Sequence, residues 1–213
     1  MKRFLALMLA LCTLCHVAVL AEEPLPETAV TREGEACGVT ILRNHRETDT
    51  ATQRTALDYP TFECSDEAFA QFLTQNITEP ICRMGQMDAG QARGGYCASL
   101  DFEGVLSVEA SVSRLPEGAK ETEVELFYVL VDLNGKRLLR LADLFTEPEA
   151  VVMEAICAAV YKQAEEMNLL LDTITDSGLV PLPDSYFLTT DYLRVLYDTQ
   201  TLGAQAVALL ARV

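Results

Sequence analysis

The chain has 213 residues, of which 32 are acidic and 16 are basic, so its formal net charge is −16 at neutral pH. An acidic excess of this size disfavours binding to nucleic acid and to anionic surfaces. It suits a cationic partner or simple colloidal solubility. Half of the residues are hydrophobic, which is enough apolar content for the core of one domain.

The first residues have the pattern of a secretory signal peptide. Lys2 and Arg3 give a short positive segment, residues 4–20 are uncharged and mostly apolar, and Ala21 is a small residue at the cleavage position. We expect cleavage after Ala21, which removes residues 1–21 and places the protein outside the cytoplasm. The alternative is an uncleaved membrane anchor, because a run of this length lies near the lower limit for spanning a bilayer.

Residues 22–36 are acidic, contain two prolines and show no hydrophobic periodicity, so they are predicted to form a disordered leader. The remaining residues, 37–213, are predicted to form a single α+β domain with subdomains at about 37–115 and 116–213. Within this domain, residues 37–43 are expected to form a strand and residues 43–54 a charged loop.

A helix is expected next, with Ser65 as its N-cap and Pro80 at its end, because apolar residues repeat at helical spacing between them. Segments of alternating apolar and polar residues then predict an antiparallel meander, with turns at Glu103-Gly104 and Asn134-Gly135. The meander segments are residues 96–102, 106–113, 124–130 and 136–141.

A capping pattern at Thr146–Glu149 predicts a second, long helix that runs to about Met167. Three further strands are expected at residues 186–189, 193–197 and 206–213. The predicted fold class is therefore α+β, with an antiparallel sheet, made of a meander and a C-terminal hairpin, packed against two helices.

Few residue types suited to catalysis remain outside the signal. His45 is the one histidine there, and it lies in a charged run that reads as a surface loop. A histidine-rich zinc site is therefore excluded, and a Ser-His-Asp or Cys-His device would have to use His45. No Cys-x-x-Cys pair or phosphate-binding glycine motif follows the signal, so no metal and no cofactor is expected. Glycoside hydrolysis by a pair of carboxylates stays open as an alternative. With 32 acidic residues, however, some such pair is inevitable, so its presence carries no information.

Five cysteines follow the signal, and an odd number outside the cell predicts at least one unpaired thiol. Cys157 lies in a helical stretch and reads as a small buried hydrophobe. Cys82 and Cys97 flank a glycine-containing loop and are the candidates for one disulfide, and Cys37 and Cys64 are the candidates for a second. Other pairings stay open, as does a fully reduced chain.

A row of acidic residues is the candidate binding feature. Glu121, Glu123 and Glu125 should project from the outward face of one strand, while Val124 and Leu126 point inward. Such a ridge would suit a cationic partner protein. The alternative is an ordinary solvated strand face.

The order of several short segments resembles that of one extracytoplasmic domain family of Gram-positive bacteria. These segments are Tyr59-Pro60, residues 103–108, residues 127–136 with their Gly-Lys turn, the Leu-Ala-Asp-Leu-Phe run at 141–145, and residues 187–189 before a closing hairpin. The family is the paired domain of unknown function that forms the ectodomain of RsiV-type anti-sigma factors and accompanies the catalytic domain of PdaC-type peptidoglycan deacetylases. The resemblance covers about residues 37–213.

The resemblance implies a domain that is not itself catalytic and that captures lysozyme in RsiV-type proteins. Lysozymes of the animal type are strongly basic, so an acidic receptor would suit electrostatic capture. The sequence departs from the family in having no sigma-binding segment before the apolar run and no deacetylase domain.

The leading hypothesis is thus an exported, non-enzymatic cell-envelope domain that binds lysozyme, another protein or a cell-wall glycan. No contact with nucleic acid is expected, and contact with a membrane is expected only if the signal is retained. A carboxylate-dependent peptidoglycan hydrolase and a structural envelope protein are the alternatives.

Overall fold

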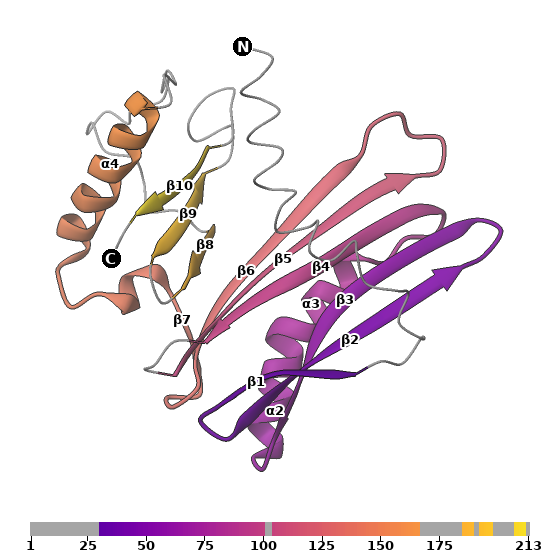
Figure 1. Cartoon of the computed structure of the whole chain (residues 1–213), viewed down its shortest axis with the longest axis horizontal. Helices are drawn as coiled ribbons and strands as arrows, with labels where there is room; N and C mark the ends of the chain where they lie inside the picture. Colours follow the sequence, from indigo (N-terminus) through magenta and orange to yellow (C-terminus); the bar gives the residue numbers. More distant parts are fainter. Residues whose placement is uncertain (1–29, 101–103, 167–184, 190–191, 198–206, 212–213) are drawn as a thin grey trace.

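Two β-sheets and two helical regions form the computed structural model, which describes residues 30–100, 104–166, 185–189, 192–197 and 207–211 (Figure 1). The strands are β1 (Thr31–Ala36), β2 (Val39–Asp49), β3 (Gln53–Cys64), β4 (Gly90–Leu100), β5 (Val105–Pro116), β6 (Glu123–Asp132), β7 (Arg137–Leu139), β8 (Ser185–Leu188), β9 (Leu193–Tyr197) and β10 (Val207–Ala211). The helices are α2 (Glu67–Leu73), the π-helical turn η1 (Thr74–Thr78), α3 (Glu79–Met84), the 3-10 turn η2 (Leu141–Leu144) and α4 (Glu149–Glu166). The predicted α+β class is confirmed.

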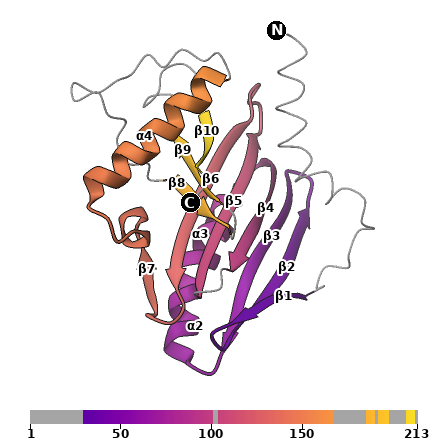
Figure 2. The ribbon, with the colours of Figure 1, turned by 60° about the vertical axis from the view of Figure 1, so that its left-hand side comes forward.

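The larger sheet has seven strands in the order β1 to β7, and the smaller has three in the order β10-β9-β8. Helices α2 and α3 lie on one side of the larger sheet, while the smaller sheet and α4 lie on the other (Figure 2). One parallel pair interrupts the expected antiparallel order, because Gln53–Leu57 of β3 pairs with Gly90–Gly94 of β4. Helices α2 and α3 form the crossover connection that a parallel pair requires.

The first three strands differ most from the sequence-based expectation. β2 and β3 pair continuously from Val39 with Cys64 to Asp49 with Arg54, so the predicted charged loop at 43–54 is strand except for the turn at residues 50–52. β1 also begins at Thr31, so the predicted disordered leader is wrong for residues 31–36. The polar side chains of β2 pair with polar side chains of neighbouring strands, which hides the alternation that would have identified a strand. The predicted signal peptide, residues 1–21, lies outside the described residues.

The first helical region does not end at Pro80. The N-cap is Asp66 rather than Ser65, because its carboxylate accepts a hydrogen bond of 3.0 Å from the backbone N–H of Phe69. Pro80 lies in the first turn of α3, directly after the π-helical turn η1. Proline is tolerated in a first turn, since its missing N–H would have no partner there. Leu73, Ile77 and Ile81 are fully buried along this region and anchor it to the sheet.

The apolar side chains form two clusters. One uses residues between Val39 and Leu133, and the other uses residues between Leu141 and Val195. The boundary between them therefore lies after β6, whereas the predicted boundary between 115 and 116 falls inside the β5–β6 hairpin. The buried Ser107 hydroxyl joins the sheets by accepting a 3.0 Å hydrogen bond from the backbone N–H of Leu188.

Candidate functional site

Among the described strands, the outer half of β6, Glu123–Val129, has a neighbour on one side only. β5 pairs with β6 along its whole length, whereas β7 reaches only Leu130–Asp132. Within the described ranges, the edge of Glu123–Val129 that faces away from β5 has no partner strand. Because β-strands direct their backbone groups alternately to the two sides, this edge presents alternate N–H and C=O groups that can pair with another chain.

Apolar side chains are exposed beside this edge. Val124, Leu126 and Leu130 share one face of β6, because side chains two residues apart point the same way. Their exposed fractions are 60% for Val124, 49% for Leu126 and 1% for Leu130. β8 covers this face near Ser107 and leaves the outer end uncovered. The expectation that Val124 and Leu126 point into the core is therefore wrong.

The predicted row of three glutamates contains two strand residues. Glu121 lies in the loop before β6, while Glu123 and Glu125 lie on β6, on the face opposite Val124. Arg114 of β5 lies across from them, with its Nη2 atom 3.0 Å from Glu125 Oε2 and 3.8 Å from Glu123 Oε2. One cation therefore partly neutralises two carboxylates, and the outer end of β6 combines acidic and apolar side chains on its two faces.

Two cavities lie at the same end of the sheet. The larger, of about 510 Å³, is lined by Asp88, Arg114, Glu117 and Glu123 among others. The second, of about 390 Å³, lies between the β2–β3 and β5–β6 turns. The Nε atom of Arg114 is buried and makes no hydrogen bond within the described part of the chain. No local sequence pattern identifies Asp88, Arg114 or Glu117, because only the pairing of β4 with β5 and of β5 with β6 brings them together.

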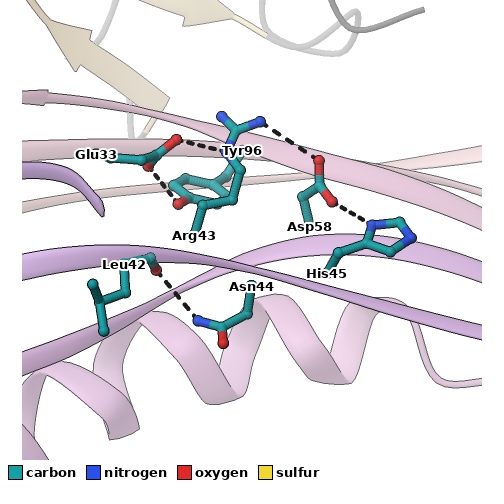
Figure 3. A network of polar contacts seen from close by, with 7 residues as sticks. All are labelled: Glu33, Leu42, Arg43, Asn44, His45, Asp58 and Tyr96. Carbon is teal, nitrogen blue, oxygen red and sulfur yellow. Dashed lines mark hydrogen bonds and ion pairs between the residues drawn. The ribbon is translucent and has the colours of Figure 1, made fainter. Parts of the chain in front are cut away.

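A network of polar side chains connects β1 to β4 (Figure 3). The Tyr96 hydroxyl donates to Glu33 Oε2 at 2.5 Å, and Arg43 Nε donates to Glu33 Oε1 at 2.6 Å. The Arg43 guanidinium also lies 5.2 Å from the centre of the Tyr96 ring. Burial opposes the charge on Arg43, but the hydrogen bond and charge of Glu33 outweigh this and raise its pKa. These contacts hold the otherwise exposed strand β1 in place.

His45 belongs to the same network and lies on strand β2 rather than in the predicted loop. Its Nδ1 atom is 2.6 Å from Asp58 Oδ1, and the other Asp58 oxygen is 3.6 Å from Arg43 Nη1 (Figure 3). An Asp–His pair is part of many catalytic triads, where the carboxylate orients the imidazole. Here the pair continues into Arg43 and Glu33, so its contacts are those of an ion-pair network between strands.

The buried Tyr96 and the half-buried Tyr128 predict a loss of stability in alkali. Burial, with the Glu33 hydrogen bond, raises the pKa of Tyr96 far above its ordinary value of 10.0, and burial raises that of Tyr128 to about 12. Unfolded tyrosine loses its proton near pH 10 while the folded residues keep theirs, so the free energy of unfolding should fall as pH rises above about 10.

Urea unfolding at several pH values between about 9 and 11 checks this expectation. The free energy of unfolding of Tyr96→Phe should fall less steeply with pH than that of the wild type. The two slopes should differ by up to about 1.4 kcal/mol per pH unit. Parallel slopes in the two proteins would show that Tyr96 ionises equally well in the folded and unfolded states.

The structure contains neither predicted disulfide, because Cys37, Cys64 and Cys82 are free thiols. Cys64 donates to the Asp66 carbonyl at 3.0 Å, while the Cys37 sulfur lies beside Gly104. Cys82 lies on α3, which packs on the core side of the larger sheet, and Cys97 is exposed on the other face, beside Glu109. The sheet therefore separates Cys82 from Cys97. Cys157 is buried in the second cluster, in agreement with its interpretation as a small hydrophobe.

Among the residues whose positions are described, no three or more His, Cys, Asp or Glu side chains are grouped so that they could hold a metal ion. In the same ranges, no helix has the length and apolar character needed to cross a membrane.

Known proteins resemble this chain in fold and not in sequence. No family model and no curated protein matches the sequence. A crystal structure of a DUF3298 family protein from Pseudomonas aeruginosa PAO1 superposes with a TM-score of 0.55 and 12% identity, covering 89% of this chain and 91% of that one. A DUF3298 member from Bacteroides fragilis gives a TM-score of 0.52 and 10% identity, covering 88% and 92%. The chain is therefore similar in fold, over nearly its whole length, to proteins of the DUF3298 family.

Proposed function

We propose that this protein is an exported, non-enzymatic binding domain of the bacterial cell envelope and that it holds a protein ligand on the outer half of β6. One observation carries the proposal. Val124 and Leu126 are 60% and 49% exposed beside an open strand edge, with Glu123 and Glu125 on the opposite face. Proteins usually protect such edges, so an exposed apolar edge favours a contact with another chain.

The charge of the chain favours a cationic ligand. The formal net charge of −16 attracts basic proteins at long range and speeds their encounter. The resemblance to RsiV-type ectodomains adds lysozyme as the specific candidate. The fold similarity to DUF3298 proteins is compatible with this role but does not name a ligand.

The test is a calorimetric titration of the chain from Glu22 to Val213 with animal-type lysozyme at low ionic strength. We expect binding that weakens as salt is added, because screening reduces attraction between exposed charges. The double variant Glu123→Gln/Glu125→Gln should bind more weakly, whereas the control Glu47→Gln/Glu63→Gln, on exposed strand positions of β2 and β3, should not. Absence of binding at low salt would remove lysozyme as the ligand.

One observation keeps a second function open. Asp88, Glu117 and Glu123 line the larger cavity together with Arg114, and a pair of carboxylates is the minimum that glycoside hydrolysis needs. A hydrolase would release soluble products from peptidoglycan, and a single change such as Glu123→Gln would abolish their release. Binding without release of products favours the non-enzymatic proposal.

A further inference from the structure

The geometry of β6 points to a particular mode of binding, and this inference rests on the proposed function. We propose that an extended segment of a partner protein adds to the free edge of Glu123–Val129 as a further strand of the larger sheet. β7 already pairs with this edge at Leu130–Asp132. The added strand would therefore lie next to β7, on the side of β6 that faces away from β5. Edge addition supplies affinity through backbone hydrogen bonds and specificity through alternate side chains.

The two faces of β6 define the chemistry of the segment. In a paired strand, side chains directly opposite each other lie on the same face of the sheet. Partners of Glu123 and Glu125 should therefore be basic, while partners of Val124 and Leu126 should be apolar. A segment that alternates lysine or arginine with valine, isoleucine or leucine satisfies both faces at once. A basic segment without alternation satisfies only one.

Arg114 is the internal competitor of this segment. Its guanidinium already contacts Glu125 at 3.0 Å and Glu123 at 3.8 Å, and its side chain is 28% exposed. A basic side chain of the partner would share these carboxylates with Arg114. Replacing Arg114 by glutamine should therefore strengthen binding of a basic segment, which is the opposite of what removal of an ordinary contact residue would do.

A second copy of this chain fits the edge less well. Pairing of β6 with β6 of another copy would bring four glutamates to one face and would join two chains that each carry a net charge of −16. Like charges on one face of neighbouring strands are destabilising. The partner is accordingly a segment of a different, basic protein, and self-association becomes an outcome that the experiment can detect.

The experiment uses a synthetic peptide of about eight residues that alternates lysine and valine, titrated into the chain from Glu22 to Val213. A peptide of the same composition with its lysines and valines in two blocks is the control for charge alone. The alternating peptide should bind at least about tenfold more tightly, because only it places apolar and basic groups on the correct faces. Equal affinity of the two peptides would overturn strand addition.

Backbone pairing is tested by methylating the peptide at alternate backbone nitrogens. The two possible patterns place the methyl groups either toward β6 or away from it, so one pattern should abolish binding and the other should preserve it. If both methylated peptides bind like the parent, the peptide does not pair with the edge.

Protein variants then locate the site. Glu123→Gln/Glu125→Gln should lower the affinity for the alternating peptide by about tenfold. Arg114→Gln should raise that affinity by about threefold, as expected for the removal of exposed charge pairs. Glu47→Gln/Glu63→Gln should have no effect. Weaker binding to Arg114→Gln, or dimerisation of the protein without peptide, would contradict the assignment.

The outcome separates the two proposals. Lysozyme binding without peptide binding would keep the proposed function and remove strand addition. Peptide binding without lysozyme binding would keep the edge site and change the identity of the ligand.

Discussion

Replacing Gly94 by alanine is expected to lower the free energy of unfolding by about 3 kcal/mol, because a side chain at this position would force β4 and β5 apart. A Cβ atom at residue 94 would lie 2.6 Å from the Ser111 carbonyl oxygen and 3.0 Å from Val112 Cα. Both of these atoms belong to the backbone of β5, so neither can move without disturbing the pairing of the strands.

Gly95 is a control in the same strand. A Cβ atom there would meet nothing closer than Asp58 Cβ at 3.8 Å, which is ordinary van der Waals contact. Gly95→Ala should therefore change the free energy of unfolding by less than about 0.5 kcal/mol. Urea unfolding of Gly94→Ala and Gly95→Ala measures both changes in the free energy of unfolding. Equal destabilisation would show that β4 and β5 are not as close as the structure has them.

Removing the Glu33 carboxylate should lower the free energy of unfolding by about 2 kcal/mol, since Tyr96 and Arg43 each lose a hydrogen bond to it. Tyr96 is only 6% exposed, so little water could replace the acceptor that its hydroxyl loses. We expect Glu33→Ala and Tyr96→Phe to be coupled by about 1 kcal/mol in a double-mutant cycle, as is usual for directly bonded side chains.

Glu35→Ala is the matched control for this cycle. Glu35 lies on the same strand and pairs with Arg32, but both side chains are at least half exposed. Exposed ion pairs contribute little to stability, so Glu35→Ala should change it by less than about 1 kcal/mol. A loss as large as that of Glu33→Ala would mean that β1 is held by general charge effects and not by the network.

Much of the fold is visible in local sequence patterns. The β5–β6 hairpin, the turn at Asn134-Gly135, the long helix α4 and the C-terminal strands all occur near their predicted positions, because each depends on periodicity or turn chemistry within a short segment. The helix was predicted to end at Pro80, but the π-helical turn η1 leads directly into α3, and Pro80 lies in the first turn of α3.

The site depends on contacts that are distant in the sequence. Glu123 and Glu125 could be identified from alternation within one strand, but the exposure of Val124 and Leu126 follows from where β8 stops covering the sheet. Asp58 meets His45 only through the register of β2 with β3. Single-sequence patterns contain no information on such pairings, so these residues could not be assigned in advance.

Backbone hydrogen exchange of β6 tests the central claim most directly. Because Glu123–Val129 pairs on one side only among the described strands, alternate amides in this segment should exchange fast in the unliganded protein. With the alternating lysine–valine peptide bound, those same amides should become protected, while the amides near His45 and Asp58 keep their rates. Binding that leaves the β6 amides unchanged, or that protects another region instead, would contradict the account.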